Sequence, residues 1–169
     1  MLIIFTGKGK GKTTAALGIA LRSLGWQRRV AIIQFIKGYK QTGEWRFCQN
    51  NKLIDIFHTI DDKKMAIGSP TAGQRSAAKK SWIKAKEILA SKKYDLIILD
   101  ELNNACYYKI IDTKEVIDYL KVYTNKIDII VTGRGAPKKL IAAADLVSEI
   151  KEIKHPFKKG GLARKGIDL

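Results

Sequence analysis

The chain has little cysteine and no long apolar run. Its 169 residues include two cysteines, Cys48 and Cys106, which lie far apart and form no CxxC pair. Neither a zinc site nor a disulfide scaffold is therefore indicated. No apolar run approaches the roughly 20 residues that span a bilayer, and the run from Leu2 to Phe5 is too short for the apolar region of a signal peptide. We expect a cytoplasmic protein with reduced thiols and no membrane partner.

Acidic residues are scarce relative to basic ones. Lys and Arg total 32 against 16 Asp and Glu, which gives a formal net charge of +16. Such a charge could serve nucleic-acid binding through neutralisation of phosphates. The lysine pairs, however, are scattered over different segments, and no run interleaves them with aromatic residues as a base-stacking groove would. We interpret the charge as mostly solvated surface with a local demand for anionic ligands, and do not expect nucleic acid as a partner.

Short apolar segments alternate with segments of helical pattern. Apolar runs rich in β-branched residues occur at 2–5, 29–36, 53–57, 94–100, 126–132 and 145–153. Several of them are apolar at successive positions, which is typical of parallel strands buried on both faces. Helices are expected at 12–24, 71–91, 113–124 and 137–144, with Gly25, Thr113 and Pro137 at their boundaries. The alternation predicts one domain, 1–169, of the α/β class, with a doubly wound, mostly parallel sheet and ligands at the carboxyl ends of the strands.

Residues 6–14, TGKGKGKTT, lie between the first expected strand and the first expected helix, as a P-loop does. The glycines allow backbone N–H groups to turn toward a ligand, and the helix N-terminus adds partial positive charge. Lys12 can reach phosphate oxygens, and the hydroxyl of Thr13 can bind Mg²⁺. The common pattern has glycine five residues before Gly11, where this chain has Thr6. We nevertheless predict a phosphate-binding loop.

A second motif, YDLIILDEL, is an apolar strand that ends in Asp100 and Glu101. Mg²⁺ in proteins takes one or two carboxylates together with phosphate oxygens and waters. Because side chains alternate across a strand, both residues can face a metal ion only if the strand ends there. In the alternative interpretation, the two acids begin the next helix, where the helix dipole favours negative charge.

Further motifs occur in order from Phe5 to Asp168. They are TGKGKGKTTAALG, QFIKG at 34–38, GE at 43–44, LDEL at 99–102, TGRG at 132–135, and the tail motifs ADLVSEI, KH-F and GID. Together they closely resemble those of the ATP:corrinoid adenosyltransferases of the cobalamin pathway that have a P-loop. That family also has threonine at the position of Thr6. The resemblance implies the P-loop NTPase (RecA-like) fold.

The resemblance also implies the reaction. Members of the family transfer the 5′-deoxyadenosyl group of ATP to the Co(I) of a corrinoid and release triphosphate, in adenosylcobalamin biosynthesis or salvage. Carried over by position, the triphosphate would be held by Gly7, Lys8, Gly9, Lys10, Gly11, Lys12, Thr13 and Thr14. Lys12 and Glu101 would act in catalysis, and Thr13, Asp100 and Glu101 would bind Mg²⁺ (or Mn²⁺). Lys37 and Arg134 would contact phosphate or corrinoid, and the resemblance further implies a homodimer and an electron-donating reductase or flavoprotein as partner.

Two departures from the family qualify this resemblance. Members commonly carry an N-terminal extension that covers the site, whereas the first strand here begins at Leu2. Many also carry a Phe and a Trp after the third strand that displace the lower axial ligand of cobalt, whereas the segment 57–74 has Phe57 and no Trp.

The alternative function is a nucleic-acid-stimulated P-loop ATPase, motivated by the net charge. His58 and His155 have no metal-ligand spacing and are expected to be structural.

Overall fold

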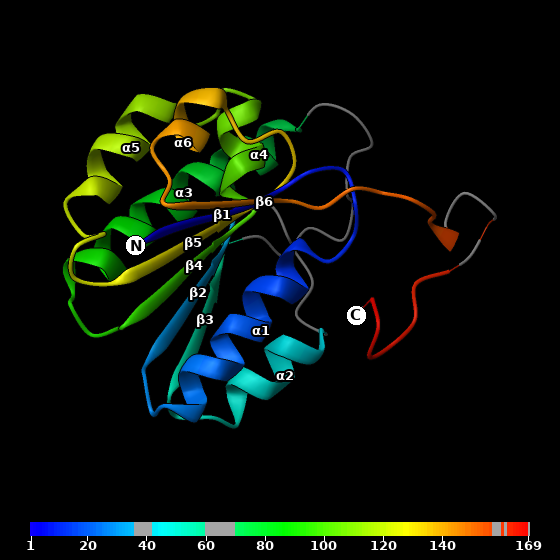
Figure 1. The fold of residues 1–169 in the computed structure, drawn as a ribbon, viewed down its shortest axis with the longest axis horizontal. Coiled ribbons are helices and arrows are strands. Elements are labelled where there is room, and N and C mark those ends of the chain that lie inside the picture. Colours follow the sequence, from blue (N-terminus) through cyan, green and yellow to red (C-terminus); the bar gives the residue numbers. More distant parts are fainter. Residues whose placement is uncertain (36–41, 60–69, 157–159, 161, 169) are drawn as a thin grey trace.

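A computed structural model describes residues 1–35, 42–59, 70–156, 160 and 162–168. Six strands form one sheet in the order β3-β2-β4-β5-β1-β6, and all five pairings between neighbours are parallel (Figure 1). The strands are β1 (Leu2–Thr6), β2 (Val30–Gln34), β3 (Ile54–His58), β4 (Leu96–Asp100), β5 (Asp128–Thr132) and β6 (Leu146–Glu149). β1, β2 and β4 are buried at every position, which is the pattern expected of parallel strands covered on both faces.

Helices cover both faces of the sheet. They are α1 (Lys12–Gly25), α2 (Gly43–Gln49), α3 (Ala72–Ala90), α4 (Leu102–Tyr107), α5 (Thr113–Lys121) and α6 (Lys138–Ala142). Figure 1 shows α1 and α2 on one face and α3, α4, α5 and α6 on the other. The predicted α/β, doubly wound architecture is therefore confirmed. No helix among the described residues is long and apolar enough to cross a membrane.

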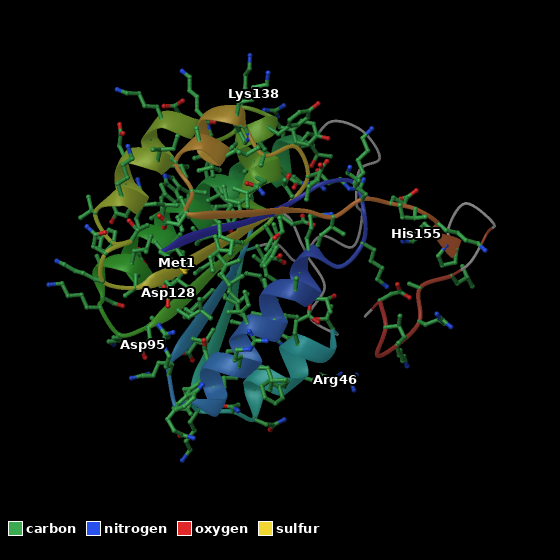
Figure 2. The ribbon with its side chains drawn as sticks, in the orientation of Figure 1. Met1, Arg46, Asp95, Asp128, Lys138 and His155 are labelled. Atoms are coloured by element: carbon green, nitrogen blue, oxygen red, sulfur yellow. The ribbon has the colours of Figure 1, made fainter. Side chains whose placement is uncertain are left out.

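The amino ends of the strands are tied together by polar contacts. Arg28 Nη2 donates to Asp128 Oδ2 at 2.8 Å and to the carbonyl oxygen of Asp95 at 2.9 Å. Figure 2 shows Asp95 and Asp128 at this end of the sheet, and His155 on the extended C-terminal segment beyond the opposite end. Contacts of this kind hold the amino ends together, whereas parallel α/β sheets bind their ligands at the opposite, carboxyl ends.

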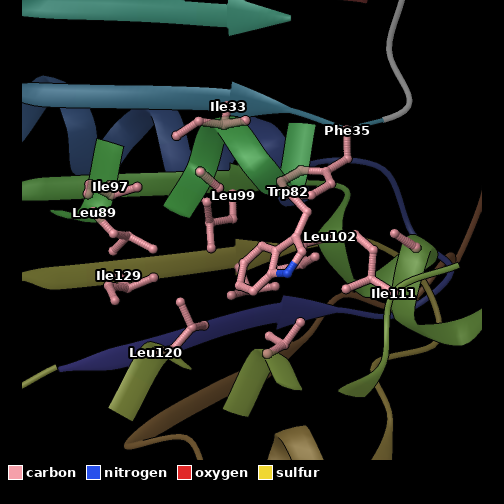
Figure 3. Packing of buried hydrophobic residues seen from close by; sticks show 14 of the residues in the cluster. Ile33, Phe35, Trp82, Leu89, Ile97, Leu99, Leu102, Ile111, Leu120 and Ile129 are labelled. Carbon is pink, nitrogen blue, oxygen red and sulfur yellow. The ribbon is translucent and has the colours of Figure 1, made fainter. Parts of the chain in front are cut away.

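Each face of the sheet packs on its own hydrophobic cluster. Ile97 and Leu99 face α3 and α5, whereas Leu96 and Ile98 face α1, because side chains alternate along β4. Figure 3 shows the larger cluster, in which Trp82 lies among the apolar side chains of the sheet. Trp82 is 4% exposed, and its indole N–H donates to Glu115 Oε1 at 2.7 Å, so it is a residue of the core.

Several boundaries differ from the expected ones. The N-cap of α5 is Asp112 and not Thr113, because the Asp112 carboxylate accepts the N–H of Glu115 at 3.1 Å. Pro137 caps α6, which begins at Lys138. The run 145–153 contributes only the short edge strand β6, and the helices α2 and α4 were not expected at all. α1 ends at Gly25, one residue beyond the expected range 12–24, and its C-cap is Trp26.

The start of α3 provides a test of local stability. The Thr71 hydroxyl accepts the N–H of Gln74 at 3.2 Å, and Gln74 Oε1 accepts the N–H of Thr71 at 2.9 Å, which completes a capping box. Thr71→Ala is expected to lower the free energy of unfolding by about 1 kcal/mol. Thr71→Ser retains the acceptor and should remain close to wild type in the same urea titration. Equal destabilisation by both substitutions would contradict a capping role.

Candidate active site

The carboxyl ends of β1, β4 and β5 open into one cleft of about 1850 Å³. Most of the predicted site residues line it, namely Lys8, Gly9, Lys10, Gly11, Lys12, Thr13, Thr14, Glu101 and Arg134. Asp100 is fully buried, and Gly7 packs against the segment that follows β6. Lys37 and residues 60–69 lie outside the described residues. The described members of the predicted set are thus brought together at one edge of the sheet.

The P-loop leads directly into α1. Gly11 has a φ of 114°, a left-handed conformation that favours glycine, and its carbonyl oxygen accepts the N–H of Ala15 at 2.7 Å. Lys12 begins the helix, and its ammonium donates to the carbonyl oxygen of Gly9 at 2.5 Å, so the side chain folds over its own loop. The first turn of α1 contains no acidic residue. Lysines and the positive end of a helix dipole therefore coincide here, which favours an anionic ligand.

Two glycines of the loop are required by close packing. The N–H of Gly9 donates to the carbonyl oxygen of Ile150 at 2.8 Å, and a Cβ at Gly9 would lie 2.6 Å from the carbonyl oxygen of Lys151. Gly7 likewise lies against the backbone of Ile150 and has a φ of 103°. The chain after β6 therefore forms a wall on which the loop rests.

Thr6 has a structural role at the position where P-loops commonly have glycine. It is the last residue of β1, in extended backbone, where a β-branched side chain is well accommodated. Its hydroxyl accepts the N–H of Ala136 at 3.2 Å. This bond joins the start of the P-loop to the loop that follows β5.

Asp100 connects three parts of the site. Its Oδ1 accepts hydrogen bonds from the hydroxyls of Thr13, at 2.9 Å, and Thr132, at 2.6 Å. β4 ends at Asp100, and Glu101 follows with a φ of 66°, in the left-handed region. The strand therefore ends between the two acids. This is the condition under which both can serve one site. Glu101 also stands at the N-cap of α4, as the alternative interpretation required, but its side chain makes no capping bond and lines the cleft.

The TGRG loop after β5 is held by α4. Asn104 Oδ1 accepts the N–H of Arg134 at 2.8 Å. The buried Asn103 donates through Nδ2 to the carbonyl oxygens of Phe5 and Gly133, both at 3.2 Å. This loop therefore has a defined conformation, while Arg134 itself is exposed on the wall of the cleft.

The C-terminal segment returns to the P-loop. The Lys10 ammonium donates to the carbonyl oxygen of Ile167 at 2.9 Å and forms an ion pair with the carboxylate of Asp168. The hydrogen bond from Lys10, supported by the N–H of Arg164, holds the pKa of Asp168 below its ordinary value. Lys10, predicted to bind triphosphate, is thus paired with Asp168 in this structure.

The two histidines lie in different places. His155 lines the cleft, whereas His58 stacks on Trp45 with ring centroids 4.2 Å apart.

The described residues contain no group of three or more His, Cys, Asp or Glu side chains that could hold a metal ion. A metal ion here would therefore need hydroxyl and phosphate oxygens in addition to carboxylates, which is the ligand set that Mg²⁺ accepts. Adjacent ligands of octahedral Mg²⁺ lie about 3.0 Å apart, given Mg–O distances of about 2.1 Å. The 2.9 Å between Thr13 Oγ1 and Asp100 Oδ1 fits this spacing. A threonine hydroxyl that donates to a carboxylate also retains lone pairs for a cation.

Four residues of this region were not singled out by the sequence. They are Thr132, Asn103, Asn104 and Asp168. Thr132 and Asp168 lie within the motifs TGRG and GID, and Asn103 and Asn104 follow Leu102 of LDEL. No local spacing indicates which strand end or loop these side chains contact, because their partners lie elsewhere in the chain.

Comparison with known proteins identifies the family to which the chain is similar. A family model described as "ATP:corrinoid adenosyltransferase BtuR/CobO/CobP" matches residues 1–169. A corrinoid adenosyltransferase of Sinorhizobium sp is 37% identical over 172 residues, which cover 100% of this chain and 80% of that protein. A corrinoid adenosyltransferase of Escherichia coli (strain K12) is 36% identical over 173 residues, 99% of this chain and 85% of that protein. Among solved structures, the flagellar accessory protein FlaH from Methanocaldococcus jannaschii aligns with a TM-score of 0.58 and 16% identity, over 88% of this chain and 70% of that one. The last similarity concerns the fold alone.

Proposed function

The chain belongs to the ATP:corrinoid adenosyltransferase family, and we propose that it transfers the adenosyl group within the cleft at the carboxyl ends of β1, β4 and β5. It is a transferase of the cobalamin pathway with the P-loop NTPase fold, and its substrates are ATP and a corrinoid. The match of the family model over all 169 residues carries this conclusion. The convergence of the P-loop with Asp100 and Glu101 supports the location of the site.

The reaction determines what the protein must supply. The nucleophile is the Co(I) of the corrinoid and the carbon attacked is C5′ of the ribose, so the triphosphate is the leaving group. No water or acceptor hydroxyl has to be activated. The protein instead holds the triphosphate, compensates its charge and orients C5′ toward the cobalt. In our proposal the backbone of Gly7–Thr14, the N-terminus of α1 and the ammonium of Lys12 perform the first two tasks.

We further propose that Mg²⁺ (or Mn²⁺) binds with ATP beside Thr13. Thr13, Asp100 and Glu101 would supply the protein ligands of the ion. When bound, the ion would neutralise part of the charge of the triphosphate. The fit between the Thr13–Asp100 distance of 2.9 Å and the spacing of octahedral ligands supports this assignment. Arg134, exposed on the cleft wall, and Lys37, from the QFIKG motif, are proposed to contact phosphate or corrinoid.

The proposed cellular setting follows from the family and from the cysteines. Both cysteines are buried, and burial raises the pKa of Cys48 to about 11 and that of Cys106 to about 12. Both therefore stay protonated and unreactive at neutral pH. We propose that the chain acts in the cytoplasm as one P-loop domain, assembles as a homodimer and receives its reduced corrinoid with the help of an electron-donating reductase or flavoprotein.

Product analysis tests the proposed function. The protein should be mixed anaerobically with ATP, Mg²⁺ and chemically reduced cob(I)alamin. We expect a light-sensitive alkyl-cobalt product together with one equivalent of triphosphate, because the bond that breaks joins C5′ to the α-phosphate oxygen. Omission of the corrinoid is the control, since ATP should then remain intact. ADP and phosphate as the sole nucleotide products would contradict the proposal.

The nucleic-acid-stimulated ATPase is not favoured. The net charge of +16 was its motivation, whereas the whole chain matches a family of adenosyltransferases. Failure of DNA and RNA to raise ATP turnover at near-physiological salt is the result expected here.

A further inference from the structure

Thr132 occupies the centre of the site although no motif assigns it a role. It is the last residue of β5 and is fully buried. In the sheet, β5 lies between β1, which leads into the P-loop, and β4, which ends at Asp100. A side chain at this position can reach the carboxylate of the neighbouring strand directly.

The hydroxyl of Thr132 makes two hydrogen bonds of opposite sense. It donates to Asp100 Oδ1 at 2.6 Å and accepts the backbone N–H of Glu101 at 3.0 Å. A hydroxyl offers one donor and two acceptor lone pairs, so both bonds form at once. A single side chain thereby fixes the carboxylate of one acid and the backbone of the next.

The second bond matters because the backbone at Glu101 is unusual. Its φ of 66° is left-handed, a conformation that non-glycine residues seldom adopt without support from their surroundings. The N–H that enters this turn is the one bound by Thr132. The oxygen that accepts the first bond is shared with the P-loop, since the hydroxyl of Thr13 donates to the same Oδ1 at 2.9 Å. Asp100 Oδ1 thus receives one hydroxyl from β5 and one from α1.

We propose that Thr132 is a positioning residue for the metal-dependent binding of ATP, acting through Asp100 and Glu101. The inference rests on the proposed function of this cleft. Without the hydroxyl, Asp100 loses the donor that β5 supplies to Oδ1, and the backbone N–H of Glu101 loses the acceptor supplied by Thr132. Both acids would then sample orientations in which they no longer serve the same ion. Loss of such supporting partners typically costs about 10–100-fold in metal affinity.

Two substitutions separate this role from simple packing. Thr132→Val keeps the shape of the side chain and removes the hydroxyl, whereas Thr132→Ser keeps the hydroxyl and removes a methyl group. ATP binding should be measured by calorimetry at stepped Mg²⁺ concentrations, without corrinoid. For Thr132→Val we expect the half-saturating Mg²⁺ concentration to rise about 10–100-fold, and KM for ATP in the transfer assay to rise more than kcat falls. Thr132→Ser should stay within about threefold of wild type. Thr124→Val, remote from the cleft, is the control for replacing a threonine hydroxyl.

The outcomes separate the two proposals. Wild-type Mg²⁺ dependence in Thr132→Val would overturn the inference while leaving adenosyl transfer intact. Equal losses in the Ser and Val variants, together with lowered melting temperatures in both, would also overturn it, because packing would then explain the effect. If the wild-type protein binds ATP with Mg²⁺ but forms no alkyl-cobalt product, the proposed function fails, and the calorimetric comparison still decides the role of Thr132.

Discussion

Replacing Lys12 by alanine is expected to lower the rate of adenosyl transfer by roughly 10²–10³-fold. Lys12 is the first residue of α1, and its ammonium lies over the P-loop, bonded to the carbonyl oxygen of Gly9 at 2.5 Å. A cation at a helix N-terminus is electrostatically unfavourable unless an anion binds there. The negative charge on the leaving triphosphate grows as the C5′–oxygen bond breaks, so the ammonium stabilises the transition state more than the ground state. Both kcat and kcat/KM should therefore fall.

The stability of the variant distinguishes this role from a structural one. Because the Lys12 charge opposes the helix dipole, Lys12→Ala should unfold at the same temperature as wild type or slightly higher. Lys79→Ala removes the same charge from an exposed position on α3 and should leave the rate unchanged. Lys12→Arg retains the charge with a different shape and should be intermediate, since the guanidinium does not reproduce a point charge. A rate for Lys12→Ala within a few-fold of wild type would exclude Lys12 from the reaction.

The sheet could be predicted because its signal is local. β2 and β4 are apolar at nearly every position, and burial on both faces follows from that alone. α2 and α4 could not, because helices of 7 and 6 residues are too short to establish a 3.6-residue period. α4 also lacks an N-terminal capping signal, since Glu101 enters it in a left-handed conformation without a side-chain bond.

The residues of the site also fall into two groups, those with a local sequence signal and those without one. The loop residues Lys12 and Thr13 and the strand-end acid Asp100 could be placed from sequence, since strand–loop–helix and strand-end positions are local features. Their approach to one another follows from parallel strands that end at one edge of the sheet. The contact of Thr132 with Asp100 spans 32 residues and that of Lys10 with Asp168 spans 158. No periodicity or short motif encodes the distance between such pairs, so only the folded chain identifies them.

The glycines of the P-loop show why a motif can be correct for more than one reason. Gly11 needs its positive φ, and a Cβ there would meet nothing within 4 Å. Gly9 is the opposite case, because the restriction is space: a Cβ would lie 2.6 Å from the carbonyl oxygen of Lys151 and 2.8 Å from that of Ile150. Backbone atoms cannot move aside as a flexible side chain can. Gly9→Ala must therefore displace either the P-loop or the wall formed after β6.

Gly9→Ala is accordingly expected to lower the free energy of unfolding by about 1–3 kcal/mol, the usual cost of overpacking, and to raise the KM for ATP by at least about tenfold. The second effect follows because the N–H of Gly9, bonded to Ile150, sets the position of the loop that would surround the triphosphate. Gly18→Ala is the matched control, since Gly18 is exposed in α1 with nothing within 4 Å of a Cβ. That substitution should stabilise the protein by about 0.5–1 kcal/mol and leave the KM unchanged. Chemical denaturation and steady-state kinetics on both variants provide the measurement. If Gly9→Ala retained both wild-type stability and a wild-type KM, the wall formed after β6 would not hold the P-loop in place.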